Sequence, residues 1–277
     1  MKKILLATTV LAMTASVAAA EVAVSGSARM GIVNDGTDTA FSSRVRIVFA
    51  GSGTTDGGLS FGAEMRADQN GGNASGTANG DSTVFVSGSF GTLTMGDVAG
   101  GAADNLVGQV SGVGYTGLGD NNEIGFLGGT ATAARYNYTS GALSVAVGIG
   151  QPTAADEAAS VAVKYAAGSY SVALGYSDTA TDSQVDLKGT ATFGAATVSA
   201  RVADRDSAAD VAYALSLDYV AGAATVTAFM GDNVNFAGRD TAGLGVSYDL
   251  GGGAAVKAGV ADNGTDTIYE AGVTLSF

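Results

Sequence analysis

The chain has 277 residues and contains neither histidine nor cysteine. This composition excludes His- and Cys-based catalysis, disulfide frameworks and the usual zinc sites. Acidic residues outnumber basic ones by 26 to 13, which argues against nucleic acid as a partner. The 43 glycines against the single Pro152 favour strands and tight turns, because an interior glycine destabilises a helix.

The first residues predict a secretory signal peptide over residues 1–20. A positive start at Lys2 and Lys3 precedes a short apolar run, and three alanines stand before Glu21. The run is shorter than the roughly 20 residues that span a bilayer as a helix. We therefore expect one mature domain over residues 21–277, in which 11 basic residues face 26 acidic ones for a net charge of −15.

From residue 21 onward, apolar and polar residues alternate with a period of two, the pattern of strands with one apolar face. Val45, Ile47 and Phe49, for example, alternate with Arg44 and Arg46. In all of the clearest runs, the interior charges lie in the polar row. Because a charged side chain facing lipid at the midplane costs about 2–4 kcal/mol, this distribution predicts strands that cross a membrane. A soluble β-sandwich also alternates, but its polar row is usually rich in Lys and Glu, whereas here it is mostly small.

Short glycine-bearing links separate pairs of alternating runs, as hairpin turns do. They lie at residues 55–58, 89–91, 140–141, 167–168, 193–194, 221–222 and 251–253. Longer polar connections lie between them. Short turns at one rim and longer loops at the other predict an all-β, transmembrane antiparallel β-barrel of about 16 strands.

The longest connection runs from Asp97 to about Gly129 and shows no clear alternation. Its charged residues are all acidic: Asp97, Asp104, Asp120 and Glu123. A loop of this length inside a compact fold is uncommon and usually functional.

Three further features carry a family resemblance. Phe277 ends an alternating strand, as the last residue of outer-membrane barrels does. The run from Val86 to Gly96 is similar to the turn before the constriction loop of general bacterial porins, and Arg135-Tyr136-Asn137-Tyr138 is similar to the strand after it. The whole chain resembles that family, and its acidic, glycine-rich character is closest to the alphaproteobacterial, Rhodobacter-type branch.

The resemblance implies an outer-membrane homotrimer, in contact with lipid and lipopolysaccharide, whose long loop folds into the barrel lumen. In that family, basic residues on the first strands face carboxylates on the loop. The matching residues here are Arg29, Arg44, Arg46 and Arg66 on the wall, and Asp97, Asp104, Asp120 and Glu123 on the loop. We expect the other inward cations to be solvated by pore water: Arg135, Lys164, Lys188, Arg201 and Lys257.

These observations predict a porin for passive diffusion of small hydrophilic solutes and ions, with a mild cation preference from the net charge and the acidic loop. A non-conducting structural or adhesive barrel and a substrate-specific channel are the alternatives. A secreted calcium-binding β-roll would need a Gly-Gly-x-Gly-x-Asp repeat, which the chain lacks. No enzymatic activity and no resident cofactor are expected, although calcium between loop carboxylates is left open.

Overall fold

The computed structural model describes residues 21–70, 73–74, 82–98, 101–128, 133–151 and 158–277. The predicted signal peptide, residues 1–20, lies outside the described residues. The strands are β1 (Glu21–Asn34), β2 (Thr39–Thr54), β3 (Ser60–Asn70), β4 (Asn73–Ala74), β5 (Ser82–Gly88), β6 (Gly91–Gly96), β7 (Ala133–Ser140), β8 (Leu143–Ile149), β9 (Ala158–Ala167), β10 (Tyr170–Thr179), β11 (Ser183–Phe193), β12 (Ala196–Arg205), β13 (Ala212–Ala221), β14 (Ala224–Asp232), β15 (Thr241–Gly251), β16 (Ala254–Asp262) and β17 (Thr267–Ser276).

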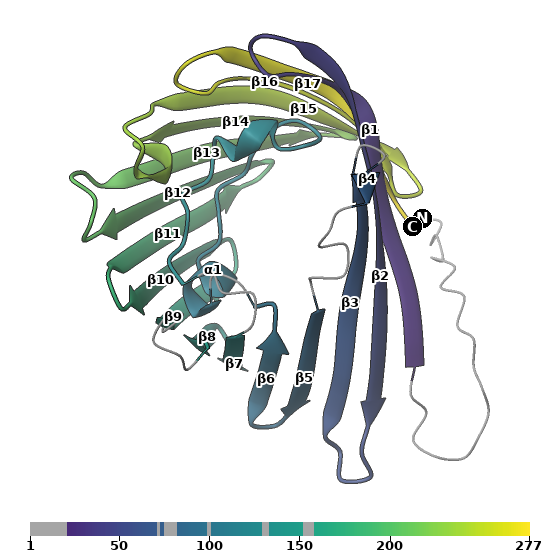
Figure 1. The fold of residues 1–277 in the computed structure, drawn as a ribbon, viewed down its shortest axis with the longest axis vertical. Coiled ribbons are helices and arrows are strands. Elements are labelled where there is room, and N and C mark those ends of the chain that lie inside the picture. Colours follow the sequence, from purple (N-terminus) through teal and green to yellow (C-terminus); the bar gives the residue numbers. More distant parts are fainter. Residues whose placement is uncertain (1–20, 71–72, 75–81, 99–100, 129–132, 152–157) are drawn as a thin grey trace.

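The strands form one closed antiparallel barrel, which Figure 1 shows as a ring. The two-residue β4 pairs only with the end of β3, so the wall itself has 16 strands, as predicted. Closure comes from the pairing of β1 with β17, which runs from Ser27 opposite Ser276 to Asn34 opposite Tyr269. Phe277 extends this pairing, because its N–H donates to the Gly26 carbonyl (3.0 Å) and its carbonyl accepts from the Gly26 N–H (2.7 Å).

The tight turns all lie at one rim, at the seven places that the glycine pattern predicts. At Gly168 and Gly194 the backbone has φ of 59° and 62°, a left-handed conformation that favours glycine over any residue with a Cβ. The longer connections lie at the opposite rim. Short turns at one end and long loops at the other are the arrangement of outer-membrane barrels, in which the long loops are extracellular.

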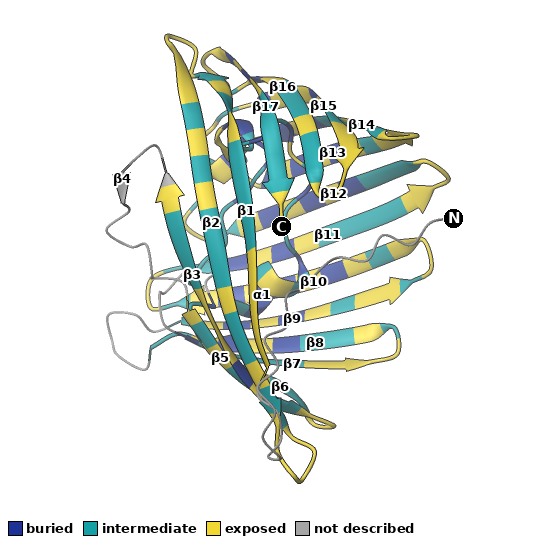
Figure 2. Cartoon of the chain, turned by 90° about the vertical axis from the view of Figure 1, so that its right-hand side faces the viewer, coloured by how far each residue is buried: buried dark blue, intermediate teal, exposed yellow. Residues whose placement is uncertain are grey.

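Side chains of the wall alternate between an exposed outward row and a more covered inward row, as the bands along the strands in Figure 2 show. In β9, for example, Val161 is 50% exposed and Val163 is 37% exposed, whereas Ala162 between them is 2% exposed. The apolar row therefore forms the outer surface, where a soluble protein would have its polar residues. This is the face that lipid covers in a membrane barrel.

The buried residues lie where the segment between β6 and β7 packs against the inner wall. This segment contains α1 (Gly101–Leu106) and the single turn η1 (Leu118–Asp120), and a second single turn, η2 (Val234–Phe236), precedes β15. The apolar residues of the segment between β6 and β7 pack against the wall in three clusters, which contain Ala102, Val110 and Val113. The wall side of the first two clusters is made of alanines, and that of the third includes Phe229 and Ile268. In the described part of the chain, no helix is both long enough and apolar enough to cross a membrane.

Candidate pore lining and the inward loop

The four predicted wall arginines come together on the inward face of β1, β2 and β3. Arg29 in β1 lies directly opposite Arg44 in β2. Arg46 and Arg66 follow on β2 and β3, where Arg66 lies opposite Val48 in the β2–β3 register. β1 and β2 contain no buried residue, as Figure 2 shows, although Arg29 of β1 donates to the Thr116 carbonyl of the segment between β6 and β7.

Asp68 belongs to the same cluster, and the sequence analysis did not include it. Its carboxylate accepts from Arg46 Nε (2.8 Å) and Nη2 (3.2 Å), and it lies 3.0 Å from Arg66 Nε. Asp68 stands two residues after Arg66 on the same strand, so the period-two alternation would have placed it in the inward row. The wall cluster thus contains four cations and one carboxylate that bridges two of them.

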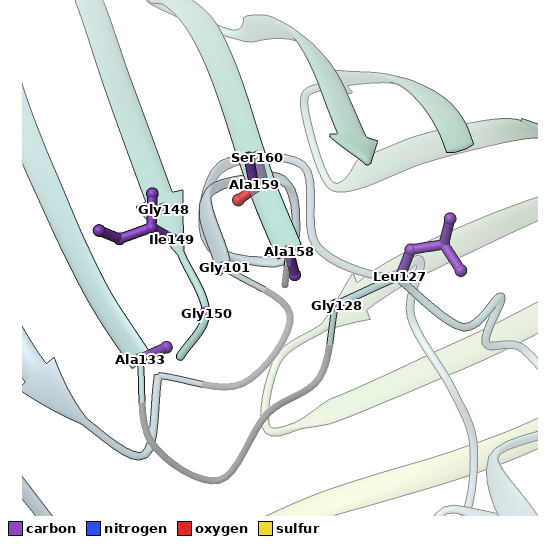
Figure 3. A pocket seen from close by; sticks show the side chains of 10 residues that line it. All are labelled: Gly101, Leu127, Gly128, Ala133, Gly148, Ile149, Gly150, Ala158, Ala159 and Ser160. Atoms are coloured by element: carbon purple, nitrogen blue, oxygen red, sulfur yellow. The ribbon is translucent and has the colours of Figure 1, made fainter. Parts of the chain in front are cut away.

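The segment 101–128, which we call the inward loop, follows the inner wall, and Figure 1 shows it with α1 inside the ring of strands. It begins where the Ala102 N–H donates to the Ser160 hydroxyl of β9 (2.8 Å). Figure 3 shows Ser160 beside Gly101 and Gly148 at this point. A Cβ on Gly148 would lie 2.7 Å from the Ser160 Oγ, so only glycine leaves room for the contact.

Glycines give the inward loop the same close approach at other points of the wall. A Cβ on Gly175 in β10 would lie 2.8 Å from the Ala103 Cβ, and a Cβ on Gly245 in β15 would lie 2.7 Å from the Val113 Cβ. Gly259 in β16 approaches the loop backbone in the same way. Glycine is therefore needed in the strands as well as in the turns, because the loop can approach the strand backbone closely only where there is no Cβ.

Hydrogen bonds fix the inward loop to the wall from β7, where the Asn137 amide donates to Asn105 Oδ1 (2.6 Å), to β17. At the far end, the Thr116 N–H donates to Oε1 of Glu270 (2.6 Å) and the Thr116 hydroxyl donates to Oε2. The wall residues that bond to the loop include Ser160, Gln184, Lys188, Arg201, Ser216, Asp218, Thr241 and Glu270.

The strongest of these attachments is a buried charged network beneath the loop. Arg201 Nη2 donates to Asp186 Oδ1 (2.6 Å), and both side chains have no exposed surface. Arg201 Nη1 donates to the Ile124 carbonyl (2.7 Å) and to Gln109 Oε1, and its guanidinium carbon lies 3.7 Å from the centre of the Phe126 ring. The expectation that Arg201 is solvated by pore water is wrong, because the inward loop covers it.

Lys188 is also bonded to the loop, since its Nζ donates to the Gln109 carbonyl. Both cations satisfy backbone carbonyls that would otherwise lie buried without a donor. The sequence contains no signal for this role, because it does not show which strands the loop crosses.

The four predicted loop carboxylates do not form one group. Asp97 lies at the end of β6, where its N–H donates to the Ser82 carbonyl (2.8 Å). Asp104 lies in α1 and Asp120 in η1, and the Glu123 N–H donates to the Asp120 carbonyl (2.9 Å). In the described part of the chain, no ion pair joins any of them to Arg29, Arg44 or Arg46.

Burial raises the pKa of Asp104, and the positive charges of Arg201 and Arg135 oppose that rise. Burial also raises the pKa of Glu123, and the negative charges of Asp120 and Asp104 raise it further. Asp104 and Asp120 are therefore close enough to Glu123 to act on its carboxyl group electrostatically.

Comparison with known proteins agrees with this architecture. A sequence model described as the Gram-negative porin family matches residues 7–267. A porin of Rhodobacter capsulatus is 40% identical over 309 residues, covering 93% of this chain and 100% of that protein. The chain belongs to the Gram-negative porins.

Two solved structures have the same fold as this porin. One, described as porin refined at 1.8 Å resolution, is 36% identical and superposes with a TM-score of 0.77, covering 93% of this chain and 100% of the other. The other, a variant of the Rhodopseudomonas blastica porin, has a TM-score of 0.79 at 23% identity, covering 92% and 100%. At that identity the second match supports the fold alone.

The predictions of family, barrel and outer-membrane location are thus confirmed. The porin is a channel of the outer membrane that crosses the bilayer with many strands, and it is not an enzyme. Within the described residues, the porin has no group of three or more His, Cys, Asp or Glu side chains placed to hold a metal ion.

Proposed function

We propose that this porin is a water-filled pore for passive diffusion of small hydrophilic solutes and ions, narrowed by the inward loop and mildly selective for cations. The observation that carries the proposal is the course of the loop: its hydrogen bonds follow the wall from Asn137 in β7 to Glu270 in β17. Of Arg29, Arg44 and Arg46, Arg29 alone has a hydrogen bond to the described part of the loop, through the Thr116 carbonyl. Solutes would pass between the wall cluster and the loop carboxylates.

The charges support a mild preference. In the described part of the chain, Asp104, Asp120 and Glu123 form no ion pair with Arg29, Arg44 or Arg46. On the wall, Asp68 offsets part of the charge of Arg46 and Arg66. Facing rows of opposite charge set ion preference in water-filled pores, and a partly compensated basic row favours a small cation preference over a large one.

Assembly and export belong to the same proposal. Family membership supports a porin oligomer, and we propose a homotrimer in contact with lipid and lipopolysaccharide. Residues 1–20 would serve as the signal peptide that directs the chain across the inner membrane, leaving residues 21–277 as the barrel.

Single-channel recording of the refolded protein in planar bilayers tests the pore. We expect steady open channels and a reversal potential under a salt gradient that leans towards cations. The triple variant Asp104→Asn, Asp120→Asn, Glu123→Gln should lower the cation-to-anion permeability ratio.

Asp56→Asn is the matched control, because Asp56 is an exposed carboxylate in the turn between β2 and β3, at the rim of the tight turns. It should leave the reversal potential unchanged. A barrel that inserts but never conducts would contradict the diffusion pore and favour a structural or adhesive barrel, and an unchanged reversal potential in the triple variant would remove the loop carboxylates from the account of selectivity.

A further inference from the structure

A polar cavity of about 470 Å³ opens between the tip of the inward loop and the rim that carries the long connections. Its lining comes from β1, from β17, from the loop tip and from three rim connections. The residues that the argument uses are Arg29, Asn34, Asp35, Arg239, Asn263 and Glu270. Because the long connections of outer-membrane barrels are extracellular, the cavity lies at the outer mouth of the pore.

Two guanidinium groups in this cavity have only weak partners. Arg29 Nη1 donates to the Thr116 carbonyl at 3.5 Å, and Arg239 Nη1 donates to the Asn263 carbonyl at 3.4 Å. Both distances exceed the usual range of N–H···O hydrogen bonds. Elsewhere in the barrel, Arg46 and Arg201 donate to carboxylates at 2.8 and 2.6 Å. Since a guanidinium has five N–H donors, both arginines keep Nη donors for another acceptor, whereas Arg29 Nε is buried without a partner in the described chain.

The two carboxylates of the cavity are engaged by the protein itself. Both oxygens of Glu270 accept from Thr116, and Glu270 is only 2% exposed. Asp35 Oδ1 accepts the N–H groups of Thr37 and Asp38, both at 2.9 Å, within its own turn. The cavity therefore offers under-used donors, and of its four carboxylate oxygens only Asp35 Oδ2 has no hydrogen-bond partner in the described chain.

Amide groups add further donors. The side-chain oxygen of Asn263 accepts from the Thr265 and Asp266 N–H groups, at 2.9 and 2.8 Å, which turns its NH₂ group away from that turn. Two arginines and a nearby amide are the donor set that recognises planar or tetrahedral oxyanions.

We propose that this cavity is a low-affinity binding site for small free anions that carry a carboxylate or phosphate group. Arg29 and Arg239 would supply charge-assisted hydrogen bonds to the anion, and Arg29 would connect the site with the arginines deeper in the wall. The lining faces the lumen, so the ligand is a solute and not a lipid headgroup. Binding itself does not depend on conduction, whereas a part in solute uptake rests on the proposed diffusion pore.

Inorganic phosphate is the probe, titrated against the refolded full chain in a detergent without phosphate or lipopolysaccharide and followed by phosphorus NMR line width. Arg239→Gln should weaken binding about tenfold, since it removes one charged donor group. Arg239→Lys, which keeps the charge and loses the fork of donors, should weaken it less. The control is Lys164→Gln, which removes an inward charge of β9 that does not line the cavity.

Equal phosphate affinity in the wild type and Arg239→Gln would overturn the proposal. So would an equal loss in Lys164→Gln, because it would reduce the effect to the overall charge of the lumen. Absence of phosphate binding to the folded wild-type barrel would overturn it as well. Recording the same proteins in bilayers separates the two proposals: a conducting wild type without phosphate binding refutes only the site, and a binding but silent barrel refutes only the pore.

Discussion

The substitution Arg201→Met should release the inward loop while leaving the barrel closed. Arg201 joins the loop to the wall through Asp186, the Ile124 carbonyl and Gln109, and it stacks on Phe126. Methionine fills part of the same volume but donates no hydrogen bond. The backbone pairing of the wall strands does not use this side chain, but its ion pair with Asp186 links β12 to β11. The loss is therefore shared between this link and the docked state of the loop.

The size of the destabilisation follows from the buried carboxylate of Asp186, which loses its partner in Arg201→Met. Asp186 has no exposed surface, and without Arg201 its charge keeps only the Gln184 amide, at 3.0 and 3.1 Å. Removal of one partner of a buried ion pair typically costs about 3–5 kcal/mol. If detachment of the loop lets water reach Asp186, the undocked population rises by a factor of about 10²–10⁴.

Hydrogen exchange of the loop amides measures this population directly. In Arg201→Met, amides from Ser111 to Gly125 should exchange about 10²-fold faster or more, and single-channel currents should become noisier. The double variant with Asp186→Leu should recover part of the protection, because no buried charge is then left unpaired. The control Lys257→Met removes an inward cation without a hydrogen bond or ion pair in the described chain. Wild-type exchange rates in Arg201→Met would refute the idea that this network holds the loop.

Two further predictions concern the packing of the inward loop on the wall and the charge of its carboxylates. Gly245→Ala brings a Cβ to 2.7 Å from the Val113 Cβ, so it should destabilise the docked loop by about 1–3 kcal/mol. The loop amides should then exchange faster with solvent. In the control Gly189→Ala, the added Cβ meets nothing within 4 Å, so the exchange rate of the loop amides should not change. Burial raises the pKa of Asp104 and Glu123, so the cost of burying their charge disappears on protonation, and the docked loop should gain stability as the pH falls. The part of the cation preference that these two residues supply should fade at a higher pH than exposed carboxyl groups would give, measured as reversal potential against pH.

The period of two accounts for what the sequence predicts well. It assigns Arg29, Arg44, Arg46 and Arg66 to one face, and the structure places all four on the lumen side. The turns are equally local, because a glycine in a left-handed conformation marks each tight link without reference to the rest of the chain. Asp68 lies in the same row and the same reasoning would have found it.

The sequence near the inward loop does not show which wall residues the loop will contact. Ile124 and Arg201 are separated by 77 positions, and neither neighbourhood shows that a carbonyl of one will meet the guanidinium of the other. The expectation that Arg201 is an ordinary solvated lumen charge fails for this reason. The residue types in the row are visible in the sequence, but the loop that covers some of them is set by long-range packing.

The covering of Arg201 also bears on selectivity. Arg201 lies beneath the loop and acts electrostatically on Asp104 and Glu123, but its charge is offset by Asp186 at 2.6 Å and has no exposed surface. It can lower the pKa of Asp104 and Glu123 through the field, yet it cannot meet a permeating anion. In the proposed pore, ions would meet Asp104, Asp120 and Glu123 on one side and a basic row partly offset by Asp68 on the other, so we expect a small preference for cations that depends on the ionisation of the loop.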